Sequence, residues 1–114
     1  MWLLPSLVLG ARGILSGAGS VVAELQVALW RAVQDDDLAK ARDAYERLQF
    51  TVSAFYADPL VDMHNRMKEA LVLLGKAKAA YVRPPLVKLA PEEIQRIGSL
   101  LRKAGLIGTG VTIN

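Results

Sequence analysis

The residues best able to do chemistry in this sequence stand together in the stretch Asp62–Glu69, DMHNRMKE. On a helix, His64 and Lys68 would lie four residues apart on one face, as would Asp62 and Arg66. His64 could then act as a general base and Lys68 as an amine nucleophile. The simpler interpretation is an exposed or interfacial histidine beside an Asp62–Arg66 ion pair. We favour it because the sequence supplies no buried carboxylate that would orient the histidine.

A second candidate is the small-residue turn Gly17–Ser20, GAGS. Such a turn ahead of a helix can bind a phosphate or a carboxylate at the helix N-terminus. The chain lacks both the P-loop pattern and the full GxGxxG spacing of dinucleotide-binding proteins. We therefore expect a tight strand-to-helix turn in which Ser20 caps the following helix.

Composition narrows the possible classes of protein and of functional site further. The chain has 114 residues, enough for one domain at most and far short of a complete (β/α)8 barrel of about 250 residues. Hydrophobic residues make up 53% and charged residues 22%, which excludes an intrinsically disordered chain. Cysteine is absent and there is one histidine, so a disulfide framework, a cysteine-ligated metal site and a histidine pair are all excluded.

Charge points to no nucleic-acid or metal partner. The formal net charge is +3, and the stretch Lys76–Ala90 alone carries four basic residues and no acid. The rest of the chain therefore sums to −1, and no predicted helix carries a continuous basic stripe, so we expect no nucleic-acid binding. The triplet Asp35–Asp37 could suggest a metal site. It lacks the spaced ligands of a calcium loop, and we expect a loop followed by a helix N-cap.

The N-terminal stretch 1–17 differs from the rest because it is apolar and holds a single charge, Arg12. A secretory signal would need a positive n-region and an A-x-A site, and both are missing. The apolar run before Arg12 is too short to span a membrane. We favour an amphipathic piece, 2–9, followed by a short buried strand, 13–16, bracketed by glycines. A small secreted or membrane-attached helical protein stays open as an alternative, which N-terminal sequencing of the mature chain would decide.

The remaining segments have the apolar spacing of helices. Proline and glycine mark their ends: Asp58–Pro59 ends the second predicted helix, Gly75 follows the third, and Pro91 opens the fourth. Pro84–Pro85 prevents a helix in the connection 76–90. The six lysines lie on helices or in this connection, and none stands in a strand-like apolar run that would lower its pKa for Schiff-base chemistry. The predicted helices span residues 20–34, 38–56, 61–74 and 91–104.

Three stretches in this order resemble the C-terminal part of the dihydrodipicolinate synthase/N-acetylneuraminate lyase family. Residues 9–17, LGARGILSG, look like the last barrel strand of the family, with its G-A-x-G-[VI]-[IL]-S pattern. Residues 67–75, MKEALVLLG, are similar to a helix of the family that ends in L-G. Residues 82–106 hold the R-P-P-L segment and a closing helix like those that end these enzymes. The resemblance covers residues 2–107.

The resemblance implies an α/β parent, a (β/α)8 TIM barrel with a C-terminal helical extension. This chain would be a mostly α-helical fragment with one barrel strand, near residues 13–16. Residues 1–35 would form the last helix-strand-helix portion of the barrel, and residues 36–107 the three-helix extension. Residues 108–114 would be a flexible tail.

The resemblance also implies a function. Members are cytoplasmic lyases and aldolases, usually homotetramers, that form a Schiff base between a lysine and pyruvate or another 2-oxo acid without a metal or organic cofactor. Their Schiff-base lysine and relay tyrosine lie on strands that precede this part, so the isolated chain is expected to be inactive and to hold no catalytic residue. Leu15, Ser16 and Gly17 match the wall of the substrate pocket. The alternative is a standalone helical module that associates with full-length homologues.

Overall fold

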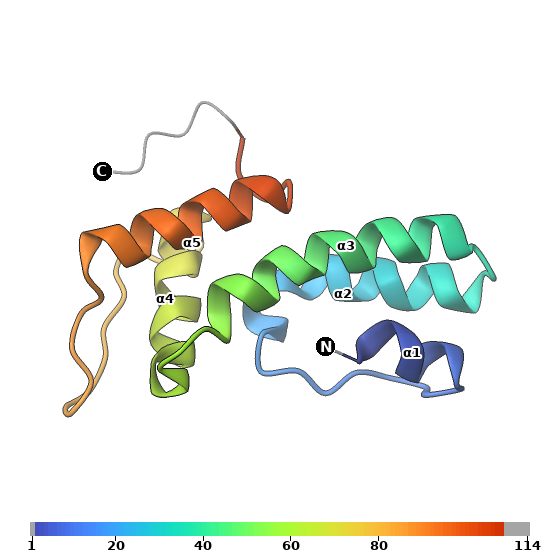
Figure 1. Ribbon diagram of the computed structural model, residues 1–114, viewed down its shortest axis with the longest axis horizontal. Helices are drawn as coiled ribbons and strands as arrows, with labels where there is room; N and C mark the ends of the chain where they lie inside the picture. Colours follow the sequence, from blue (N-terminus) through green and yellow to red (C-terminus); the bar gives the residue numbers. More distant parts are fainter. Residues whose placement is uncertain (1, 109–114) are drawn as a thin grey trace. The chain divides into compact units, whose positions relative to one another are not determined.

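A computed structural model describes residues 2–108 of the chain (Figure 1). These residues form five α-helices and one 3-10 turn, and contain no β-strand. The chain divides into two compact units, Met1–Gln49 and Phe50–Asn114. Each unit has its own buried apolar residues, and they are described separately below. No helix among the described residues is both long enough and apolar enough to cross a membrane.

The first unit contains α1 (Leu3–Val8), α2 (Gly19–Gln34) and the first part of α3 (Leu38–Phe55). Figure 1 shows α2 and α3 running antiparallel, with α1 beside α2. The apolar spacing that predicted these helices also gives their buried face, since residues three and four apart lie on one side of a helix. The buried apolar residues of this unit are Leu7, Ala18, Val21, Val22, Leu25, Leu29, Ala32, Ala41, Ala44 and Leu48.

The turn between α2 and α3 confirms the interpretation of the aspartate triplet as a loop and an N-cap. The backbone N–H of Lys40 donates to Asp37 Oδ1 at 3.0 Å, the bond expected from a capping aspartate. Asp36 takes a positive φ of 54°, a conformation that aspartate tolerates better than most residues. No group of three His, Cys, Asp or Glu side chains within residues 2–108 could hold a metal ion.

Two predictions for the segment before α2 are wrong. Residues 13–16 form irregular chain rather than a strand, because no other extended segment lies among the described residues to pair with them. Ser20 is not the N-cap: α2 already begins at Gly19, and its capping position is Ala18, without a side-chain bond. Val22 has non-helical backbone angles, so α2 is kinked after its first turn.

The second unit contains the end of α3, a 3-10 turn (Leu60–Asp62), α4 (Met63–Leu73) and α5 (Pro91–Lys103). Pro91 stands at the start of α5, and Gly75 follows α4 with a positive φ of 70°, as the sequence predicts. The predicted third helix begins as the 3-10 turn, not as α-helix. Buried apolar residues of this unit are Ala54, Phe55, Met67, Ala70, Ile97, Leu101, Ala104 and Ile107.

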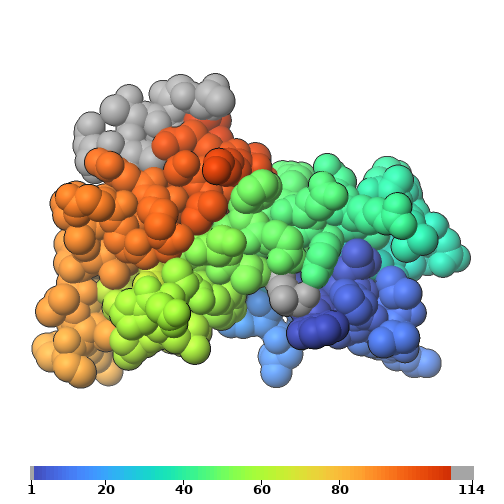
Figure 2. Space-filling view, in the orientation of Figure 1, coloured from blue at the N-terminus to red at the C-terminus, as the bar shows by residue number. Residues whose placement is uncertain are grey.

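The connection 76–90 contains no helix, as Pro84–Pro85 predicts, and hydrogen bonds attach it to α4. Figure 2 shows its light-orange atoms along the left side of the second unit. Three α4 side chains hold it. Asn65 Nδ2 donates to the carbonyl oxygen of Val87 at 2.7 Å, and Lys68 Nζ donates to that of Tyr81 at 2.6 Å. Lys88 Nζ lies 2.8 Å from Glu69 Oε1. A proline-rich connection is thereby fixed without any regular structure of its own.

Candidate functional site

The residues predicted to line the substrate pocket lie in the irregular segment ahead of α2. Leu15 is fully exposed, with a relative accessibility of 107%, and Gly17 is also exposed. Ser16 Oγ accepts hydrogen bonds from Gln26 Nε2 at 2.8 Å and from the backbone N–H of Ala18 at 3.2 Å. Ser16 therefore orders the turn into α2, while Leu15 makes no packing contact that would hide it from solvent.

The same segment borders an open hollow of about 260 Å³ in the first unit. Its wall is mostly apolar, and one edge is the backbone of the segment. Among the described residues, no backbone–backbone hydrogen bond involves residues 12–15, although Trp30 Nε1 donates to the carbonyl oxygen of Arg12 at 3.1 Å. The edge thus offers free peptide groups beside an apolar floor. The lining residues are Arg12, Gly13, Ile14, Ala23, Gln26, Val27 and Trp30.

The structure does not assemble a catalytic pair at His64 and Lys68. The side chain of His64 is exposed and forms no hydrogen bond within residues 2–108, and Lys68 Nζ is directed to the carbonyl oxygen of Tyr81. A general base needs an orienting partner and a nucleophile within reach, and neither is present here. The favoured interpretation of an exposed histidine is confirmed, whereas the Asp62–Arg66 ion pair predicted with it is wrong.

The side chain of Arg66 instead points into the second unit, where it forms hydrogen bonds with a carboxylate and with several backbone carbonyl groups. Its side chain is 2% exposed, and its Nε donates to Glu93 Oε1 at 2.7 Å. Its Nη1 and Nη2 donate to the backbone carbonyl oxygens of Ala57 (2.6 Å), Pro59 (3.1 Å) and Asp58 (3.0 Å). One guanidinium therefore fixes the chain that leaves α3.

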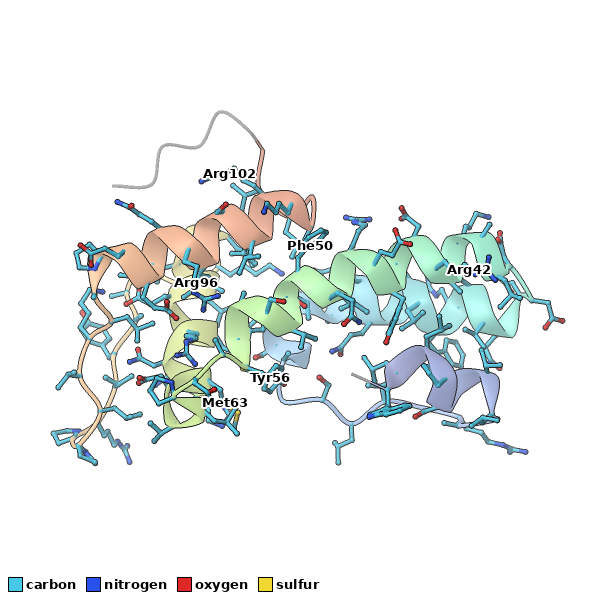
Figure 3. All side chains as sticks on the ribbon, in the orientation of Figure 1. Arg42, Phe50, Tyr56, Met63, Arg96 and Arg102 are labelled. Carbon is cyan, nitrogen blue, oxygen red and sulfur yellow. The ribbon has the colours of Figure 1, made fainter. Side chains whose placement is uncertain are left out.

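Arg96 completes the same arrangement from α5 (Figure 3). It donates through Nη1 to the carbonyl oxygen of Ser53 at 2.9 Å and through Nη2 to that of Ala54 at 3.1 Å. Both carbonyls belong to the last turn of α3, where a helix has no partners of its own for them. Two bonds of 2.8 Å, from Nε and Nη2, join Arg96 to Glu93. We call Arg66, Glu93 and Arg96 the arginine clamp.

The electrostatics of the clamp favour an ionised carboxylate. The hydrogen bond from Arg96 is the largest cause that holds the pKa of Glu93 at about 2, below the usual 4.5, and the bond from Arg66 acts in the same direction against the opposing effect of burial. The bond to Glu93 raises the pKa of Arg96. All three nitrogens of Arg66 donate within the protein, so the clamp is a structural centre rather than a binding site.

Comparisons with known proteins identify the family of this chain. The model of the dihydrodipicolinate synthetase family matches residues 1–104. The chain belongs to this family. A crystal structure of dihydrodipicolinate synthase superposes with a TM-score of 0.71 at 26% identity, covering 91% of this chain and 35% of that one. The chain thus shares the fold of one part of a TIM-barrel enzyme, as the resemblance implied, although the expected strand is absent from the described residues.

Curated relatives agree on the family and differ in their named substrates. A 4-hydroxy-tetrahydrodipicolinate synthase from Archaeoglobus fulgidus is 33% identical over 106 residues, which are 91% of this chain and 35% of that protein. One from Kineococcus radiotolerans is 35% identical, covering 90% of this chain and 33% of that protein. A third relative, from Escherichia coli, carries the provisional name 2-dehydro-3-deoxy-D-gluconate aldolase. It is 31% identical, and the match covers 91% of this chain and 34% of that protein.

The chain spans about a third of the length of the curated relatives it matches. Synthase-named and aldolase-named relatives match it at similar identity. This part of the family fold is therefore shared between proteins named for different substrates.

Proposed function

We propose that this chain is the C-terminal part of a lyase that forms a Schiff base with pyruvate or another 2-oxo acid. The observation that carries the proposal is the match of the family model over residues 1–104, combined with coverage of only a third of each relative. The parent would make or break a carbon–carbon bond, or dehydrate a sugar acid, with a lysine outside this chain. It would be a cytoplasmic homo-oligomer, a homotetramer in the usual form of the family.

In this proposal the chain by itself is not catalytic. Support comes from the chemistry of its own residues: Lys68 Nζ is exposed and donates to the backbone carbonyl oxygen of Tyr81. A Schiff-base lysine requires a lowered pKa, which burial or a neighbouring cation provides. The chain would contribute the wall formed by Leu15, Ser16 and Gly17, in which the side chain of Leu15 is fully exposed.

The test is reductive trapping. The chain is incubated with pyruvate and borohydride beside a full-length family synthase as the positive control, and both are analysed by intact mass. We expect a pyruvate adduct on the synthase and none on this chain. An adduct on any of its lysines would overturn the proposal of an inactive chain.

A second candidate function is a helical interaction module that binds full-length family members. The observation that favours it is the second unit, which has its own buried residues and the arginine clamp. Co-purification of the chain with a co-expressed full-length synthase would support this function. The function would be contradicted if the chain were a monodisperse monomer that melts cooperatively and does not bind the synthase.

A further inference from the structure

The second unit has an open hollow of about 230 Å³ between α4 and the first half of the connection 76–90. Its wall is mostly apolar and holds one charged side chain. Small-ligand sites typically combine an apolar wall with a few polar groups that fix the orientation of the ligand. The lining residues are Lys68, Leu71, Ala77, Ala79 and Tyr81.

The charged side chain of this hollow is Lys68, and its ammonium is held in place. Lys68 Nζ donates to the carbonyl oxygen of Tyr81 at 2.6 Å, which is the one hydrogen bond of this side chain within residues 2–108. An ammonium has three donors and no acceptor. Two N–H groups of a positioned cation are therefore left for an acceptor from outside the protein.

The backbone beside Lys68 adds further donors. Among the described residues, the peptide N–H groups of Ala79 and Tyr81 donate to no other group. Both residues line the hollow. Backbone N–H groups are strong donors that normally have a partner. The hollow thus combines donors from a side chain and from the main chain, which suits an anion.

The charges of the two segments around the hollow favour an anion as well. The one acidic residue of α4 is Glu69, which is buried and lies 2.8 Å from Lys88 Nζ. An anion near Lys68 would therefore meet no unpaired carboxylate from α4 or from the connection. The connection itself has no acid and four basic residues, which are Lys76, Lys78, Arg83 and Lys88.

We propose that this hollow binds a small organic acid, whose carboxylate contacts Lys68 and whose apolar body lies against Leu71 and Ala77. One lining cation matches a single negative charge, and the apolar wall matches the body. Drug-sized ligands occupy pockets of about 300–1,000 Å³, so a smaller molecule fits here. The inference goes beyond the proposed function, because it uses neither a Schiff-base lysine nor the wall at residues 15–17.

The experiment titrates benzoate into the ¹⁵N-labelled full chain at physiological salt and records amide chemical shifts. We expect saturable shifts at residues 68–71 and 77–81. Benzamide has the same ring without the charge, and acetate has the charge without the ring. Each should bind at least about tenfold more weakly than benzoate, because each lacks one half of the match.

Two pairs of variants locate the site. Ala79→Asp places a negative charge at an exposed lining position and should weaken benzoate binding at least about tenfold. Val87→Asp is its control: Val87 is 74% exposed in the same connection but does not line the hollow, and the change should be less than about threefold. Lys68→Met should also abolish binding, whereas Lys103→Met, at an exposed lysine in the last turn of α5, should not.

The results separate support from contradiction. Saturable shifts confined to the two segments, lost in Ala79→Asp and Lys68→Met and kept in both controls, would support the inference. It is overturned if benzamide binds as tightly as benzoate, or if the same shifts occur throughout the chain. Binding that survives either Ala79→Asp or Lys68→Met would also overturn it. None of these outcomes depends on whether pyruvate is trapped, so the proposed function is tested separately.

Discussion

Arg66 and Glu93 lie 27 residues apart in the chain, yet Arg66 Nε is 2.7 Å from Glu93 Oε1. The bond joins α4 to the first turn of α5, and Glu93 shares its carboxylate with Arg96. The end of α3 is attached to the same centre through its carbonyl groups. One carboxylate therefore connects α4 and α5, and its two arginine partners attach the end of α3 and the chain that follows it.

Glu93→Gln should destabilise the second unit by about 2–4 kcal/mol, because it leaves the buried Arg66 without its anionic partner. The amide preserves shape, so the loss would come from charge and hydrogen bonding. Glu92→Gln, at an exposed neighbouring position in the same first turn, is the control and should cost less than about 0.5 kcal/mol. Urea unfolding followed by circular dichroism measures both. Equal effects of the two changes would mean that the clamp does not stabilise the unit.

The pH dependence follows from the pKa of Glu93, which is lowered to about 2 from the usual 4.5. A group with a lowered folded-state pKa stabilises the fold fully above its unfolded value, and this contribution is lost as pH falls through the folded value. Stability should therefore decline between about pH 5 and pH 2, by roughly 3 kcal/mol at most from this group. Arg66 and Arg96 stay charged throughout this range, so the titrating partner is Glu93.

The measurement is the free energy of unfolding across that pH range for the unsubstituted chain and for Glu93→Gln. The substituted chain should show a shallower acid dependence, because glutamine does not titrate. Parallel curves for the two chains would show that other carboxylates cause the loss.

The helices could be predicted from local sequence patterns, because helix formation depends mainly on residues that are close together in the sequence. The apolar spacing of α2 and α3, the Asp37 cap, and the positions of Gly75 and Pro91 all involve residues within one or two turns. Such features are decided by backbone geometry and side-chain periodicity, which can be read without knowing the tertiary fold. The comparison of residues with the family pattern then gave the correct family.

The arginine clamp could not be predicted in the same way. Arg66 looked like an ordinary surface residue with Asp62 four positions away, and Glu93 looked like a favourable charge at a helix N-terminus. Its true partners are backbone carbonyls and a carboxylate 27 residues away. The one available signal was that Arg66 precedes the buried Met67 and lies four residues before the buried Ala70, on a face that enters the core.

The predicted strand at 13–16 failed for a related reason. A strand exists only when another extended segment supplies its hydrogen bonds, and the described residues contain none. The apolar residues and bracketing glycines predicted a buried strand, whereas the structure leaves Leu15 exposed in a segment that borders an open apolar hollow. A sequence pattern can indicate that a segment is suited to a β-sheet, but a strand forms only when a second extended segment is present to pair with it.

Asn65→Ala should loosen the connection 76–90. Asn65 is fully buried, and its Nδ2 holds the carbonyl oxygen of Val87 at 2.7 Å. Removing the donor leaves that carbonyl unpaired, with a stability cost of about 1–2 kcal/mol; the loss of Asn65 Oδ1, which has no partner among the described residues, offsets part of it. Hydrogen exchange of the Leu86 N–H, which donates to the carbonyl oxygen of Arg83 at 3.1 Å, should accelerate, while α5 stays protected. Uniformly faster exchange in α5 as well would indicate general unfolding.

Leu15→Asp should leave the isolated chain as stable as before, within about 0.5 kcal/mol, because Leu15 is fully exposed and packs against nothing. Leu7→Asp is the contrasting change, since Leu7 is 3% exposed in the first unit and should not tolerate a carboxylate. In complex with the rest of a family fold, Leu15→Asp should instead weaken assembly strongly, because the proposed pocket wall would bury the new charge. Thermal unfolding of the chain and affinity of the co-expressed complex separate the two effects. A Leu15→Asp chain that assembles like the unsubstituted one would place this residue outside any buried wall.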